Sequence, residues 1–105
     1  MRRLPVRLTE TAIASLMDIA DYIAEASGSV DVALAFTDRI ERRCRKIADA
    51  PNGGTPRADL GEDVRLVPFE RSTVILYRVA DEYVDIIDIV YGGRDYAAIL
   101  GRKAS

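Results

Sequence analysis

Two consecutive apolar runs in the second half of the chain limit what it can fold into. The first, residues 74–79, is rich in β-branched and aromatic side chains and carries one cation, Arg78. The second, residues 83–91, has the same character, and only a short segment with Asp81 and Glu82 lies between them. This composition predicts two strands that pair as an antiparallel hairpin. The first run is apolar at both parities, which indicates a central strand buried on most of both faces.

Length and composition predict a single soluble domain. The chain has 105 residues, 49% hydrophobic and 30% charged, so we expect one core and one domain over residues 1–105. The net charge of −2 argues against nucleic-acid binding over the whole surface. A local basic patch is still compatible with this net charge. No run approaches the roughly 18 apolar residues of a membrane span, and no signal peptide is recognisable. We therefore expect a cytoplasmic protein without membrane contact.

The absence of histidine excludes most catalytic and metal chemistry. The chain has no histidine and one cysteine, Cys44. Ser-His-Asp and Cys-His couples are therefore excluded, and so is a zinc site. A single cysteine cannot close an internal disulfide, which fits a reducing compartment. Because Cys44 falls on the apolar stripe of a predicted helix, we interpret it as a buried hydrophobic side chain rather than a reactive thiol. No metal or cofactor is expected.

The first half of the chain predicts one strand and two helices. Residues 4–8 alternate apolar and polar, and Pro5 suits an edge strand. Thr9 can cap a helix over about residues 10–26, which Gly28 ends. Apolar side chains recur every three or four residues along this helix, as in an amphipathic helix. They are Ile13, Leu16, Met17, Ala20, Ile23 and Ala24.

A second helix, capped by Ser29 and ending before Pro51, must lie antiparallel to the first because two or three residues join them. Its apolar stripe consists of Ala33, Phe36, Ile40, Cys44, Ile47 and Ala48. Five cations crowd its other faces: Arg39, Arg42, Arg43, Arg45 and Lys46. We interpret them as a solvated face, with an acidic partner or nucleic acid as the alternative.

The order of elements predicts an α+β fold. Residues 51–61 are rich in Gly and Pro and predict a loop, residues 64–69 a further strand, and Asp95 can cap a short helix from Tyr96 to about Leu100. Strand, two helices and three strands place a helical hairpin on one face of a small antiparallel sheet of four strands. Because the helices cover one face only, we expect the other to expose hydrophobic surface that needs a protein partner.

A set of positions over nearly the whole chain has a distinctive order and spacing. The set is Asp18-Ile19, Tyr22-Ile23, Ala33, Phe36, Ile40, Ile47-Ala48, Pro51, Gly54, Arg65, Ile75-Leu76-Tyr77-Arg78, Ile86 and Gly92-Gly93-Arg94-Asp95-Tyr96. It resembles the RelE/ParE superfamily of toxins from bacterial type II toxin–antitoxin modules. The resemblance implies a toxin that a small ParD-like antitoxin neutralises by folding a disordered segment onto it. It also implies a hetero-oligomer that meets operator DNA only through the antitoxin.

The superfamily divides by target, and individual positions favour the ParE branch, which as a group inhibits DNA gyrase without catalytic residues. RelE-like members instead cleave messenger RNA on the ribosome, using several cations and a tyrosine near the C-terminus. Arg65 and Arg94 match two of those cations. Val67 and Val74, however, stand where a lysine and an arginine are usual, and Leu100 stands about where the tyrosine should be. The alternatives are a RelE-like endoribonuclease and a non-toxic binding partner or co-repressor.

We assign no catalytic residues, and the resemblance gives six candidates for target binding. They are Arg65, Tyr77, Arg78, Arg94, Asp95 and Tyr96. Arg94 follows two glycines at a strand end, where loops carry function, and is the first candidate.

Three of these candidates have structural alternatives. Tyr77 can be a core residue with its hydroxyl bonded. Arg78 can form an ion pair across the hairpin with Asp85 or Asp88. Asp95 can be a helix cap.

Overall fold

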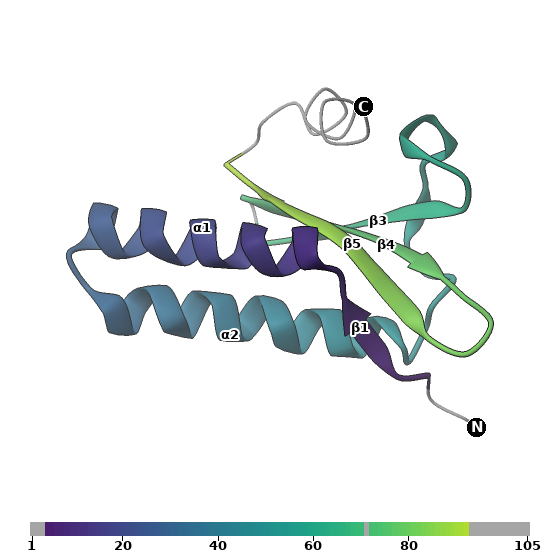
Figure 1. The fold of residues 1–105 in the computed structure, drawn as a ribbon, viewed down its shortest axis with the longest axis horizontal. Coiled ribbons are helices and arrows are strands. Elements are labelled where there is room, and N and C mark those ends of the chain that lie inside the picture. Colours follow the sequence, from purple (N-terminus) through teal and green to yellow (C-terminus); the bar gives the residue numbers. More distant parts are fainter. Residues whose placement is uncertain (1–3, 71, 93–105) are drawn as a thin grey trace.

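The structure, a computed structural model, describes residues 4–70 and 72–92 of the chain. Helices α1 and α2 lie side by side against one face of a five-stranded sheet (Figure 1). The predicted α+β class and the order of the elements are confirmed. In chain order these are β1 (Val6–Leu8), α1 (Glu10–Ser27), α2 (Val30–Ile47), β2 (Thr55–Pro56), the 3-10 helix η1 (Ala58–Leu60), β3 (Val64–Phe69), β4 (Thr73–Val79) and β5 (Val84–Tyr91).

The predicted hairpin is the centre of the sheet. Strands β4 and β5 pair antiparallel from Val79 opposite Val84 to Thr73 opposite Tyr91, and β4 is the middle strand of the order β1-β5-β4-β3-β2. The register shifts beside Tyr77, so that β5 carries one extra residue there. Such a β-bulge bends its strand and re-aims the neighbouring side chains.

The first strand lies at the edge of the sheet, as Pro5 indicates, but it pairs parallel to β5. The expectation of an all-antiparallel sheet is therefore wrong for this strand. Val84 N–H donates to the Pro5 carbonyl and Thr9 N–H donates to the Ile86 carbonyl, which fixes the register. An alternating apolar pattern carries no information on strand direction, since both ladders satisfy the same two-residue period.

The capping predictions for both helices are confirmed. The Thr9 hydroxyl accepts a hydrogen bond from Ala12 N–H at 3.1 Å, and the Ser29 hydroxyl accepts one from Val32 N–H at 3.2 Å. Gly28 ends α1 with a φ of 72°, a left-handed conformation that glycine adopts without strain. These side chains satisfy helix-end donors that would otherwise have no partner.

One main hydrophobic core lies between the helices and the sheet. The whole predicted stripe of α2, from Ala33 to Ala48, is buried. The predicted face of α1 is right for Leu16, which is buried, and for Ile23, which packs partly buried against the core. It is wrong for Ile13 and Met17, which are exposed, and Ala12 and Ile19 of α1 are buried instead. Its sequence carries two neighbouring apolar stripes, and periodicity alone does not say which of the two faces the sheet.

The sheet face away from the helices is partly covered as well. Val64, Leu76 and Val90 form a second buried cluster there, with Leu60 of η1 packed against it. Leu66, Val74 and Ile87 pack against this cluster and are only partly buried, so the expectation of an exposed hydrophobic face is wrong for the cluster itself and holds in part for these three. Among the described residues, the exposed large hydrophobic side chains lie on the two helices instead. They are Ile13, Met17, Tyr22, Val30, Val32 and Leu34.

The segment predicted as a loop, residues 51–61, contains two short elements. Strand β2 pairs with β3 through Thr55–Leu66 and Pro56–Arg65, and η1 follows it. These elements contribute the fifth strand and part of the second cluster. They were missed because two or three residues are too few to show a period. The predicted helix at residues 96–100 lies outside the described residues. In the described part, no helix is long and apolar enough to cross a membrane.

Substitution of Phe36 by alanine tests the burial of α2. The ring is 8% exposed and contacts Phe69 and Tyr91, with ring centroids 6.2 and 5.6 Å away. We expect Phe36→Ala to lower the free energy of unfolding by about 3–5 kcal/mol through the cavity it leaves. Val32→Ala on the same helix is the control, because Val32 is exposed and should cost less than about 0.5 kcal/mol. Equal melting temperatures for the two variants would contradict the packing.

Candidate functional site

The candidate residue Tyr77 holds the segment after α2 against the sheet. Its hydroxyl donates to the Pro51 carbonyl at 2.8 Å and accepts from Gly54 N–H at 2.9 Å. The Tyr77 side chain is fully buried. A Cβ on Gly54 would lie 2.5 Å from the Tyr77 hydroxyl, so only glycine fits beside the ring. Tyr77 is therefore a structural residue that presents no surface to a partner.

Arg65 fastens the same segment from the neighbouring strand. Arg65 on β3 pairs with Tyr77 on β4, so both side chains reach the segment together. One terminal nitrogen of Arg65 donates to the Asn52 carbonyl at 3.0 Å and to the Gly54 carbonyl at 2.8 Å. We call the group of Pro51, Asn52, Gly54, Arg65 and Tyr77 the loop clamp. It satisfies backbone groups of a segment that has few ladder bonds of its own.

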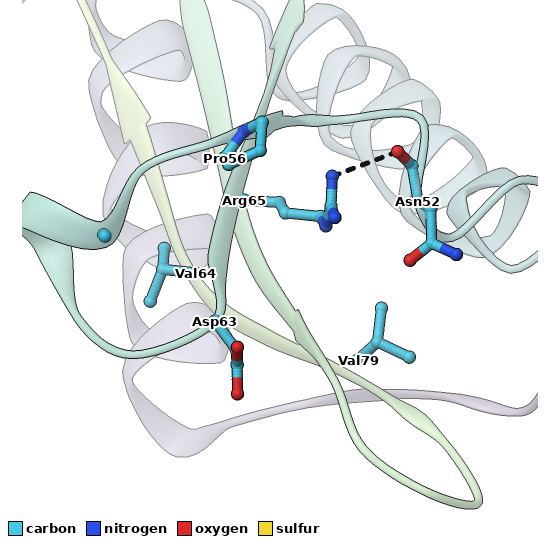
Figure 2. A pocket seen from close by; sticks show the side chains of 7 residues that line it. Asn52, Pro56, Asp63, Val64, Arg65 and Val79 are labelled. Atoms are coloured by element: carbon cyan, nitrogen blue, oxygen red, sulfur yellow. Dashed lines mark hydrogen bonds between the residues drawn. The ribbon is translucent and has the colours of Figure 1, made fainter.

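An open pocket of about 320 Å³ adjoins the loop clamp. Figure 2 shows Arg65 between Pro56 and Asn52, with Val64, Asp63 and Val79 around it. Its lining residues are Asn52, Pro56, Ala58, Asp63, Val64, Arg65 and Val79. The pocket therefore combines apolar walls with one cation and one anion.

The third described candidate, Arg78, is separate from the loop clamp. Its Nε donates to the Glu62 carbonyl at 2.8 Å. The ion pair considered with Asp85 or Asp88 is not formed in the described part of the chain. Asp85 instead lies 3.6 Å from Arg7 Nε, an ion pair too long for a good hydrogen bond. Asp88 is buried and accepts hydrogen bonds from Ser15 Oγ at 2.5 Å and from Ile89 N–H at 2.8 Å.

The β-bulge explains why Asp85 and Asp88 have different surroundings. Asp85 lies opposite Arg78, whereas Asp88 follows the register shift and meets helix α1 through Ser15. The two carboxylates therefore have different partners, Arg7 for Asp85 and Ser15 for Asp88. Within residues 4–70 and 72–92, no group of three potential ligands could hold a metal ion.

Arg57 and two arginines of α2 form ion pairs. Arg57 donates twice to the Asp59 carboxylate, at 2.8 and 2.6 Å. These hydrogen bonds lower the pKa of Asp59. On α2, Arg39 pairs with Glu70 at 3.0 Å and Arg42 with Asp38 at 2.9 Å. Arg39 and Arg42 are thus part of a mixed-charge surface.

Cys44 agrees with the interpretation of a packing residue. The side chain is fully buried on α2. Burial raises the pKa of the Cys44 thiol to about 12, and Glu41 adds to the rise. The thiolate needed for nucleophilic chemistry is therefore not populated near neutral pH.

The remaining candidates, Arg94, Asp95 and Tyr96, lie outside the described residues. Of the described candidates, Arg65 and Tyr77 come together and Arg78 does not. The exposed apolar side chains of the helices were missed as candidates. One signal in the sequence could have found them: in α1, Ile13 and Met17 form a second apolar stripe beside the buried one.

Comparison with known proteins decides the family. The model of the ParE toxin of the type II toxin–antitoxin system parDE matches residues 6–96. This chain belongs to the ParE toxin family. The match runs from β1 to beyond β5 and includes the loop clamp. No curated protein sequence matches the chain.

A solved structure supports the ParE fold. A chain from a chromosomal ParDE toxin–antitoxin system of P. aeruginosa superposes with a TM-score of 0.74 at 23% sequence identity. The match covers 86% of this chain and 97% of the other. At this identity the likeness shows a shared fold.

Replacement of Tyr77 by phenylalanine tests the loop clamp. The change removes the hydroxyl and leaves the Pro51 carbonyl and the buried Gly54 N–H without their partner. We expect unfolding to become easier by about 1–3 kcal/mol in a denaturant titration. Tyr83→Phe is the control, because Tyr83 is half-buried and stacks under Arg7 through its ring alone. Equal stabilities of the two variants would show that the hydroxyl does not hold the segment.

Proposed function

We propose that this ParE family member is the toxin of a type II module that inhibits DNA gyrase by protein–protein binding and is neutralised by a cognate ParD-like antitoxin. The observation that carries the proposal is the ParE family match over residues 6–96. Inhibition without catalysis agrees with the absence of histidine and with a buried, protonated Cys44. Gyrase and antitoxin are cytoplasmic, so the proposal places the toxin there as well.

The apolar surface of the helices supports an antitoxin contact. Ile13 and Met17 are four residues apart on α1, and Val30 and Leu34 are four apart on α2, so each pair lies on one side of its helix. Their exposed fractions range from 48% for Ile13 to 64% for Val30. Each pair is a small exposed apolar patch, and such patches can mark protein-binding surfaces. An amphipathic segment that folds on binding would cover them with its own apolar face.

The nuclease alternative finds less support among the described residues. Cleavage of a phosphodiester needs several cations around one phosphate. In the pocket, Arg65 is accompanied by the carboxylate of Asp63, while Arg57 is bound to Asp59. Val67, which stands where a lysine is usual in the nuclease branch, is buried in the core and supplies no positive charge. The described site therefore lacks the concentration of positive charge that this reaction requires.

A supercoiling assay with purified toxin tests the gyrase proposal. We expect the toxin to block DNA supercoiling by gyrase and to leave ribosome-bound messenger RNA intact. Arg94→Ala should weaken both gyrase inhibition and growth arrest, because Arg94 is the first candidate contact. Arg42→Ala is the matched control, since it removes one positive charge from the exposed surface of α2, where Arg42 pairs with Asp38. Messenger RNA cleavage with normal supercoiling would favour the nuclease, and neither effect would favour the non-toxic alternative.

A charge placed on the apolar surface tests the antitoxin contact. Met17 is 63% exposed, so Met17→Glu should leave the fold intact. We expect it to weaken binding of the antitoxin encoded beside the toxin by at least about tenfold, as measured by calorimetry. Ala14→Glu is the control, because Ala14 shares the polar face of α1 with Asp18 and Asp21. Equal loss of affinity in both variants would exclude a specific role for this apolar surface.

A further inference from the structure

The pocket beside the loop clamp holds the cation of Arg65, which forms no close ion pair with a carboxylate among the described residues. Arg65 uses one terminal nitrogen for the carbonyls of Asn52 and Gly54. A guanidinium has five N–H donors, so this leaves donors for another acceptor. Among the residues that the structure describes, no carboxylate forms an ion pair with Arg65. A bound anion would therefore complete the site.

The walls of the pocket limit what that anion can be. Pro56, Ala58, Val64 and Val79 give it an apolar lining around Arg65 (Figure 2). Its volume of about 320 Å³ is at the lower end of the range for ligand pockets. This space suits one amino-acid side chain with its methylene groups better than a nucleotide or a cofactor.

Charge selects a carboxylate over a phosphate. Asp63 also lines the pocket, so the site carries one positive and one negative group. A phosphate with up to two negative charges would be repelled by Asp63 and balanced by only one cation. A carboxylate has a single charge, and its two oxygens match the planar fork of a guanidinium.

We propose that this pocket binds the side-chain carboxylate of an acidic residue in the antitoxin, with Arg65 as its anchor. Two backbone carbonyls already fix the guanidinium, so little side-chain entropy is lost when the carboxylate arrives. The identity of the partner rests on the proposed function. The preference of the pocket for a carboxylate does not depend on the proposed function. It can be measured on the toxin alone.

A titration monitored by NMR tests whether the pocket prefers a carboxylate. The probes are N-acetylglutamate methylamide, the neutral N-acetylglutamine methylamide and inorganic phosphate, each added to the whole toxin labelled with nitrogen-15. We expect the glutamate probe to shift the Nε–H signal of Arg65 and the amides of Ala58 and Val64. The glutamine probe should shift them at least about threefold less at equal concentration. Tighter binding of phosphate than of the glutamate probe at Arg65 would overturn the proposal in favour of a nucleic-acid contact.

Two surface variants keep the test independent of the structural role of Arg65. Ala58 is exposed, and Ala58→Leu should fill the pocket and abolish the shifts. Asp63 is exposed and has a φ of 61°, a left-handed conformation that asparagine tolerates, so Asp63→Asn should remove the negative charge without strain. We expect Asp63→Asn to strengthen binding of the glutamate probe by about threefold. Binding that neither variant alters would place the probe elsewhere and contradict the proposal.

The same variants separate this inference from the proposed function. Ala58→Leu should weaken antitoxin binding while gyrase inhibition by the free toxin persists. A toxin that binds the glutamate probe in the pocket but fails to inhibit gyrase would contradict the proposed target alone. Full antitoxin affinity in Ala58→Leu would contradict the pocket's role in that complex and leave the target proposal standing.

Discussion

The structure depends on the burial of both faces of strand β4. Ile75 and Tyr77 are fully buried in the core under the helices, and Leu76 between them is fully buried in the second cluster. A strand with apolar side chains at successive positions must be covered on both sides, because each exposed side chain of this size would forgo roughly 1.5–3 kcal/mol of burial. The helical hairpin covers one face, and Leu60 of η1 contributes to the cover of the other.

Most of the fold follows from local sequence signals. Thr9, Gly28 and Ser29 set the ends of the helices, and the hairpin follows from two similar apolar runs and a short polar connection. The face of α1 could be predicted only in part, since Ile13 and Met17 give a second apolar stripe beside the buried one. The parallel direction of β1 depends on contacts with residues about 78 positions away, and a local sequence pattern contains no information on such contacts.

The positions that carry the family resemblance mainly describe the fold. Pro51, Gly54, Arg65 and Tyr77 form one structural group in the loop clamp, and their spacing reflects the need to close the chain after α2 onto β3 and β4. This explains why the sequence predicts a member of the superfamily more readily than it predicts the target. The exposed apolar side chains of the helices, such as Met17 and Leu34, lie outside this framework.

The central claim is that the loop clamp builds the fold and that the exposed apolar side chains of the helices contact the antitoxin. Hydrogen–deuterium exchange on the toxin, alone and with its antitoxin, measures this directly. The account predicts that the amide of Gly54 is protected in both states, because its hydrogen bond to Tyr77 is internal, and that amides of α1 and α2 gain protection in the complex. Helix amides that exchange at the same rate in both states, with new protection confined to other elements, would contradict it.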